Sequence, residues 1–181
     1  MKHPILLRLL ALGGLLLFLF SDSLPARDYT VSPEAVRMIK DFESCRLTAY
    51  PDAGGWSIGY GHHGEDVVPG MTITQDEAER LFREDIAKRV ASVRRLIEDL
   101  PYRMEFSQGF IDALFSLVYN CGEYRVRESQ FYRRLCECDP RNYYDHPYGY
   151  LWAAEAVLST AASSPVLSRR RRAEYNLFVS L

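Results

Sequence analysis

The sequence predicts an α+β fold, with a small helix-and-hairpin lobe, a long connecting helix and a second lobe made of helices. Apolar residues recur at helical spacing before residue 43, alternate as in strands between residues 46 and 60, and return to helical spacing from residue 74 onward. No internal repeat or linker divides the chain. Of its 181 residues, 48% are apolar and 25% are charged, which is typical of a globular domain.

The first 26 residues differ from the rest of the chain. Lys2 and Arg8 stand near the start, residues 9–20 are uncharged and mostly apolar, and the small residue Ala26 follows. This pattern predicts a secretory signal, because a spanning helix needs about 20 apolar residues. Counted from Ile5, the apolar stretch is longer, so an uncleaved signal anchor is the alternative. We expect residues 1–26 to be the signal peptide or signal anchor, residues 27–181 to be the folded domain, and the protein to be exported.

Composition excludes several classes of function. The formal net charge of −2 argues against nucleic-acid binding. Neither a nucleotide-binding glycine loop nor zinc-type spacing of cysteine and histidine occurs, so we expect no cofactor and no metal. Export would allow disulfides among Cys45, Cys121, Cys136 and Cys138, and the sequence leaves open whether they form one bridge or remain small buried residues.

The small lobe begins with a helix capped by Ser32, with Pro33 in its first turn. Strands are expected at residues 46–50 and 56–60, joined by a turn at 51–55, and a third short strand within 67–73. Residues 57, 59 and 61 are small and share one face of the second strand, which leaves space for a cleft wall.

The helical lobe follows a capping box, Thr74 to Glu77, which starts the long connecting helix. This helix should end before Pro101 and be partly exposed. The next helix starts at Ser107, is the most apolar of the chain and stops at Gly122. Further helices are expected at residues 129–138, at about 146–160 and at 165–179.

Candidate chemistry lies between Glu43 and Ser57. Glu43 follows Ile39 by one helical turn, so it should face apolar neighbours that favour its protonated form. Asp52 stands in a glycine-rich turn, where it should stay ionised. Two carboxyl groups in unlike environments are the minimum apparatus for cleaving a glycosidic bond, and the hydroxyl of Ser57 could hold a water with Asp52. Each residue also has an ordinary interpretation, as a helix-end acid, a turn former and a strand residue, and spacing alone does not decide between the two.

The stretch "FESCRLTAYPDAGGWSIGYGHH" closely resembles the phage-type lysozymes, the endolysins of glycoside hydrolase family 24 that are related to T-even phage lysozyme. The resemblance continues in "ITQDEAERLFREDI", in "FSQGFIDALFSLVYNCG" and in "LSRRRRAEYNLF". These four segments occur in the family's order and cover nearly the whole chain after residue 30. The resemblance implies a lysozyme-like fold with a cleft between the lobes, and makes residues 27–181 a lysozyme catalytic domain.

The resemblance also implies an activity. The substrate would be bacterial peptidoglycan, and the enzyme a muramidase that hydrolyses the β-1,4 bond from N-acetylmuramic acid to N-acetylglucosamine. Glu43 would protonate the leaving oxygen, Asp52 would activate a water, and Ser57 would assist it, with inversion at the reacting carbon. We further expect a monomer, membrane contact only through an uncleaved leader, and no metal. The residues expected to bind substrate are Tyr50, Gly61, His62, Arg169 and Arg170.

The chain departs from the family pattern at four places. Ser57 stands where threonine is usual, His63 stands where threonine is frequent, and the turn before Ser57 is one residue shorter. The family's usual tryptophan and glycine pattern before the final helix is altered here to Trp152 followed by "AAEAVLSTAASSPVLS". We interpret His62 as a hydrogen-bonding residue and not as a metal ligand. The ordinary interpretation of the arginine run at 169–172 is a solvent-exposed helix face, on which at most one or two of the four arginines can face inward. Three alternatives stay open: a lytic transglycosylase acting on the same bond, an inactive wall-binding module, and membrane disruption by the N-terminal segment.

Overall fold

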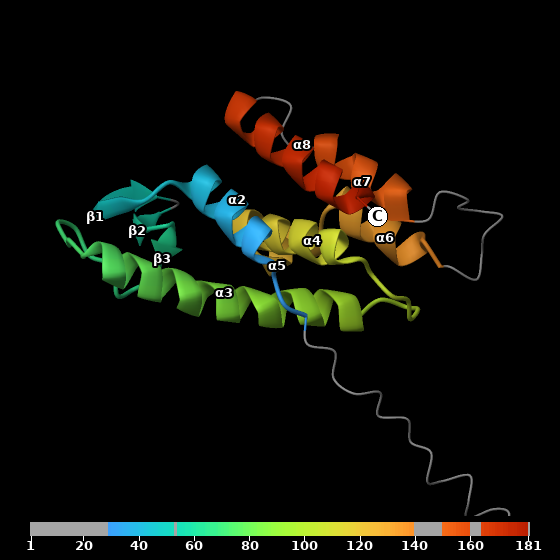
Figure 1. Cartoon of the computed structure of the whole chain (residues 1–181), viewed down its shortest axis with the longest axis horizontal. Coiled ribbons are helices and arrows are strands. Elements are labelled where there is room, and N and C mark those ends of the chain that lie inside the picture. Colours follow the sequence, from blue (N-terminus) through green and yellow to red (C-terminus); the bar gives the residue numbers. More distant parts are fainter. Residues whose placement is uncertain (1–28, 53, 140–149, 160–163, 181) are drawn as a thin grey trace, which may run out of the picture.

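The computed structural model describes residues 29–52, 54–139, 150–159 and 164–180. A three-stranded antiparallel sheet lies at one end of the molecule, and a group of helices forms the other end. One long helix, α3 (Gln75–Glu98), runs beneath both parts (Figure 1). The predicted α+β architecture is confirmed. The predicted leader, residues 1–26, lies outside the described residues.

Helix α2 (Pro33–Glu43) opens the small lobe as its sequence predicts. The Ser32 side chain accepts a hydrogen bond from the backbone N–H of Ala35, and Pro33 occupies the first turn. Ser44 ends the helix with a φ of 58°, a positive value that L-residues other than glycine rarely adopt. This conformation turns the chain sharply from α2 into the first strand, directly after Glu43.

The sheet consists of β1 (Arg46–Asp52), β2 (Gly55–Gly59) and β3 (His62–His63), in that order. Strand β1 is longer than expected, so Asp52 lies at the end of a strand and pairs with Gly55. The expectation of a third strand within residues 67–73 is wrong. That segment contributes an isolated bridge between Thr72 and Thr48, because its few backbone hydrogen bonds to β1 do not continue into a ladder.

The connecting helix α3 begins with the predicted capping box. Thr74 accepts a hydrogen bond from the backbone N–H of Glu77, and the Glu77 side chain accepts one from the backbone N–H of Thr74. Its Ala78 lies against Gly59 of β2 and its Leu81 packs in the cluster under the sheet, whereas Leu96 and Ile97 face the helical lobe. The helix therefore carries one side of both hydrophobic clusters.

The helical lobe is built around α4 (Gln108–Cys121), whose residues from 110 to 119 are all buried. The surrounding helices are α6 (Gln130–Glu137), α7 (Tyr150–Ser159) and α8 (Pro165–Val179). The start of α8 agrees with the prediction. Helix α7 is described from Tyr150 onward, and residues 146–149 of its predicted span lie outside the described part. The short helix α5 (Glu123–Arg127) was not predicted, because five residues are too few to show a helical period.

None of the four cysteines forms a disulfide in the described part of the chain, and Cys138 is the most buried of them. Within the described part of the chain, the structure thus corresponds to the expectation of small buried or half-buried residues, with no bridge.

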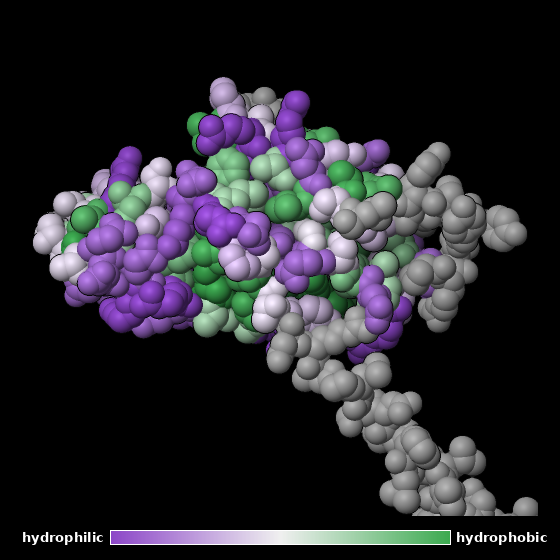
Figure 2. Space-filling view, in the orientation of Figure 1, coloured by the Kyte–Doolittle hydropathy of each residue, from purple (hydrophilic) through white to green (hydrophobic). Residues whose placement is uncertain are grey.

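Polar residues cover much of the sheet end in the view of Figure 2, and apolar residues reach the surface mainly in the middle of the molecule. Among the residues that the structure describes, no helix is both long enough and apolar enough to cross a bilayer.

Candidate active site

Glu43 is the last residue of α2 and lies at the junction of the two lobes, between Gly61 after β2 and Arg170 on α8. Its carboxylate lies against Gly61 in the turn after β2: a Cβ on Gly61 would come within 3.3 Å of Glu43 Oε2. Gly61 also has a φ of 81°, which favours glycine. Both the conformation and the closeness of Glu43 require a residue without a side chain at position 61.

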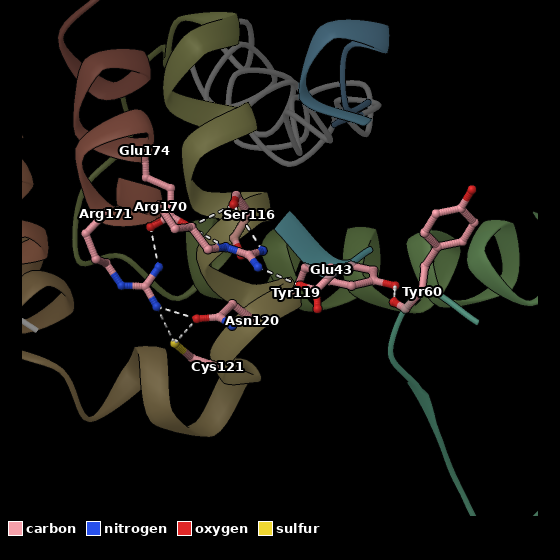
Figure 3. Close-up of polar contacts among 9 residues, drawn as sticks. All are labelled: Glu43, Tyr60, Ser116, Tyr119, Asn120, Cys121, Arg170, Arg171 and Glu174. Carbon is pink, nitrogen blue, oxygen red and sulfur yellow. Dashed lines mark hydrogen bonds and ion pairs between the residues drawn. The ribbon is translucent and has the colours of Figure 1, made fainter. Parts of the chain in front are cut away.

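The environment of Glu43 differs from the apolar one that its helical position predicts. Arg170 Nη1 on α8 donates a hydrogen bond to Glu43 Oε1 at 2.5 Å, across 127 residues of sequence (Figure 3). About a fifth of the Glu43 side chain is exposed, whereas the Arg170 side chain is almost completely buried. Glu43 therefore faces a fixed positive charge, which helix periodicity could not reveal because it comes from the other lobe.

Arg170 is held by a buried network on α4 and α8. Its Nε donates to Oε1 of the fully buried Glu174 at 3.2 Å, and its Nη2 donates to the backbone carbonyl of Ser116 at 3.1 Å. The Ser116 hydroxyl donates to Glu174 at 2.7 Å, and Arg171 donates to the other oxygen of Glu174. The guanidinium facing Glu43 is therefore fixed by charge and by hydrogen bonds on three sides (Figure 3).

Two of the four consecutive arginines at residues 169–172 face inward and two face solvent, which is the number that the sequence allowed. Arg170 and Arg171 are buried, and Arg169 and Arg172 are exposed. The Arg169 guanidinium lies 5.3 Å from the centre of the Phe42 ring, next to Glu43 in sequence. Arg171 Nη2 also donates to Asn120 Oδ1 at 2.5 Å, which joins α8 to the end of α4.

Asp52 and Ser57 meet across the hairpin. Ser57 is fully buried, and its hydroxyl donates a hydrogen bond to Asp52 Oδ2 at 2.9 Å. The pairing register places Tyr50 directly opposite Ser57 and Asp52 opposite Gly55, so these residues share one face of the sheet. The structure thus brings Asp52 and Ser57 together in spite of the short turn between them.

Tyr50 lies next to this pair on the same sheet face. Burial, followed by the negative charges of Asp52 and then Glu43, raises the pKa of Tyr50. The Tyr50 phenol therefore lies on the sheet face that carries Asp52 and Ser57. The Tyr50 ring is covered by the Arg46 guanidinium at 4.6 Å from its centre.

His62 faces away from this site. Its side chain is buried, Nδ1 lies 2.9 Å from Asp85 Oδ2 on α3, and Nε2 lies 3.1 Å from Asp66 Oδ2. Burial alone would lower the pKa of His62, but the hydrogen bonds to the two aspartates outweigh it and raise that pKa. The hydrogen-bonding role predicted for His62 is confirmed, and the ion pair ties β3 to α3.

Tyr119 makes a further contact between the lobes. Its hydroxyl on α4 donates to the backbone carbonyl of Tyr60 at 2.8 Å, one residue before Gly61 (Figure 3). Burial raises the pKa of Tyr119, so the hydroxyl stays protonated and can keep donating. The turn that faces Glu43 is thereby attached to the core helix.

Several of these residues escaped sequence reasoning, namely Ser116, Tyr119, Asp85, Arg171 and Glu174. The spacing of Arg170 and Arg171 to Glu174, four and three residues on one helix, could have indicated these ion pairs. No comparable signal joins Ser116 or Tyr119 to the site. No group of three or more acidic, histidine or cysteine side chains suited to a metal ion occurs in the described ranges.

The arrangement offers two carboxylates in different settings. One is paired with a buried guanidinium at the junction of the lobes, and the other, exposed at the end of a strand, accepts a hydrogen bond from a buried hydroxyl. Such a pair can give a proton to a leaving group on one side and orient a water on the other.

The chain is similar to known proteins in sequence and in fold. An endolysin of Acyrthosiphon pisum secondary endosymbiont phage 1 is 34% identical over 153 residues, which cover 83% of this chain and 98% of the relative. The muramidase domain of SpmX from Asticaccaulis excentricus superposes with a TM-score of 0.68 at 28% identity, covering 84% of this chain and 99% of that domain.

The chain is shorter than some of its relatives. It matches 39% of the length of the endolysin of Bacillus phage B103, with 34% identity over 108 residues, or 58% of this chain. Residues 40–174 match the sequence profile of the phage lysozyme family. The chain belongs to the phage lysozyme family.

Proposed function

We propose that this protein is a peptidoglycan-lytic enzyme, and more specifically a muramidase. It hydrolyses the β-1,4 bond between N-acetylmuramic acid and N-acetylglucosamine in bacterial cell walls. The observation that carries the proposal is the hydrogen bond of Ser57 to Asp52 in a lobe whose turn at Gly61 also lies against the Glu43 carboxylate. Membership of the phage lysozyme family supports the substrate class.

Glu43 is the proposed general acid. Its carboxyl group donates a proton to the glycosidic oxygen as the bond to the muramic carbon breaks. Arg170 holds this carboxyl group in place and is itself fixed by Glu174 and Ser116. As the proton leaves, the guanidinium stabilises the carboxylate that is formed.

Asp52 is the proposed general base, with Ser57 as its partner. The ionised Asp52 accepts a proton from a water, and the resulting hydroxide oxygen attacks the reacting carbon from the face opposite the leaving group. The Ser57 hydroxyl occupies Oδ2 of Asp52, which leaves Oδ1 for the water. Attack by a water in this position inverts the configuration at the carbon.

The proposed substrate contacts are narrower than the sequence predicts. Tyr50 lies opposite Ser57, Gly61 lies against Glu43, and Arg169 is exposed beside Phe42, so these three stay in the proposal. Arg170 is buried and has Glu43 as its partner, and both ring nitrogens of His62 are engaged. We therefore assign positioning of Glu43 to Arg170 and a structural role to His62, and leave both out of the sugar contacts.

We also propose that the enzyme acts as a monomer after export, guided by residues 1–26 as signal peptide or signal anchor. The pattern of positive charge, apolar run and small residue in the sequence supports this proposal. Mass spectrometry of the protein recovered from cells decides between the two, because cleavage after Ala26 removes 26 residues.

The test compares the parent with Glu43→Gln and Asp52→Asn on isolated peptidoglycan, with Asp41→Asn as the control because Asp41 is an exposed acid on the same helix. We expect reducing muramic ends from the parent and the control, and nearly none from the two site variants. Anhydro-muramic ends, with Asp52→Asn still active, would indicate a lytic transglycosylase. A folded parent that binds the wall without cleaving it would be a binding module. Lysis that survives both site variants would point to membrane disruption.

A further inference from the structure

We propose that His63 is a positioning residue of this site. It donates a hydrogen bond to the Ser57 hydroxyl and thereby keeps that hydroxyl oriented toward Asp52. The proposal rests on the proposed function, because it concerns the pair that orients the water. The observation behind it is the distance of 3.1 Å between His63 Nδ1 and Ser57 Oγ.

The sheet register brings His63 to this place. Ser57 pairs with His63 across β2 and β3, and with Tyr50 across β1 and β2, so the three side chains lie on one face. The neighbouring pair, Ile58 and His62, lies on the opposite face, where Ile58 is buried and His62 reaches α3. The two adjacent histidines therefore have different roles. His62 joins the sheet to α3, and His63 faces the candidate active site.

The direction of the hydrogen bonds follows from counting protons. A serine hydroxyl has one hydrogen, and an ionised aspartate only accepts, so Ser57 donates its hydrogen to Asp52 Oδ2. Ser57 must then accept from His63, which requires the proton of the imidazole to be on Nδ1. The result is a chain of donors from His63 through Ser57 to Asp52, in which each bond strengthens the next.

Serine needs such a partner more than a β-branched residue would. Its hydroxyl can occupy three staggered positions, and it has no second branch at Cβ to restrict them. With bonds to both Asp52 and His63, the hydroxyl is held in one position. It keeps one lone pair that can accept a hydrogen bond from the water on Asp52.

Gly55 provides the space for the His63 ring. A Cβ built on Gly55 would lie 2.8 Å from His63 Cε1 and 3.1 Å from Nε2, although Gly55 has no unusual backbone conformation. A side chain at position 55 would therefore displace the imidazole and break its contact with Ser57. This gives a second way to remove the contact without changing His63.

The first experiment measures kcat and KM on soluble glycan strands for three His63 variants. His63→Asn can place a donor close to the position of Nδ1, His63→Gln places it nearer to Nε2, and His63→Leu has none. We expect kcat to fall about fivefold in His63→Leu, which corresponds to one net hydrogen bond, with KM little changed. His63→Asn should recover most of the loss and His63→Gln should not. Gly55→Ala should behave like His63→Leu.

The second experiment repeats His63→Leu in a Ser57→Ala background, with thermal unfolding as the check that each variant is folded. If His63 acts through Ser57, the leucine has no further effect once the hydroxyl is gone. A fivefold loss that is the same in both backgrounds would overturn the proposal, and so would full kcat in His63→Leu.

A third measurement needs neither activity nor variants of His63. Nitrogen-15 NMR of the parent at a pH where the imidazole is neutral should show the His63 proton on Nδ1, and Ser57→Ala should shift that resonance. A proton on Nε2 would overturn the proposed contact. An inactive parent with the Nδ1 proton in place would instead contradict the proposed function while leaving the His63 contact intact.

Discussion

Replacing Glu174 with glutamine keeps the shape of the side chain but removes the negative charge that two buried guanidinium groups share. Glu174 is fully buried and accepts hydrogen bonds from Arg170, Arg171 and Ser116. After the change, Arg170 still has Glu43 as a partner, whereas Arg171 has only neutral acceptors on Asn120 and Cys121.

The expected cost follows from these contacts. Removing one partner of a buried ion pair costs about 3–5 kcal/mol, because the other charge stays buried without compensation. The glutamine oxygen can still accept one hydrogen bond, so we expect the lower end, about 3 kcal/mol. For a domain of this size, each 1 kcal/mol lowers the melting temperature by about 2–4 °C, which gives a decrease of about 6–12 °C.

The assay is urea unfolding followed by circular dichroism, together with thermal melting, on the parent, Glu174→Gln and two comparison variants. Ser116→Ala removes one hydroxyl from the same network and should cost about 1 kcal/mol. Glu98→Gln neutralises an exposed acid on α3 and should change stability by less than about 0.5 kcal/mol. A loss below about 1 kcal/mol for Glu174→Gln would refute the reasoning, since it would mean that the carboxylate does not compensate the two buried charges.

Three further predictions concern the small lobe. Because the pKa of His62 is raised in the folded protein, its ion pairs stabilise the fold fully at a pH below the unfolded-state pKa near 6.5, and this stabilisation is lost as the pH rises through the folded-state pKa. His62→Gln should therefore lower the melting temperature more at pH 5 than at pH 9, and an equal decrease at both would contradict this reasoning. Gly61→Ala places a Cβ 3.3 Å from Glu43 Oε2 at a backbone φ of 81°, so we expect urea unfolding to show a loss of about 1 kcal/mol in stability. Because the Cβ would also displace Glu43, a turbidity assay should show at least a tenfold loss of lysis, and unchanged lysis would show that Gly61 does not restrain Glu43. Ser44→Gly relieves a backbone conformation that favours glycine and should raise stability by about 1 kcal/mol in the same urea assay, and a lower stability would show that the Ser44 side chain contributes more than the strain costs.

Local sequence determined most of the secondary structure. Caps at Ser32, Thr74, Ser107 and Ser129 start helices where the pattern places them, because the capping contact joins residues only three apart. The local pattern did not predict the position of the third strand. Residues 62–63 and Thr72 pair with the sheet only because of the path by which the chain returns to it, and that path is not a local property of the sequence.

Residue type and spacing were enough to select the candidates for the chemistry: Glu43 at a helix end, Asp52 and Ser57 in a hairpin, and a run of arginines near the C-terminus. The surroundings of these residues could be known only from the three-dimensional fold. Arg170 reaches Glu43 from 127 residues away, and Tyr119 attaches the turn before Gly61 to the core helix. His63 reaches Ser57 because two strands pair in one register and not in the next. Side-chain periodicity reports which face a residue occupies, but the charge and hydrogen-bond partners on that face come from other elements, and their positions are set by packing of the whole core.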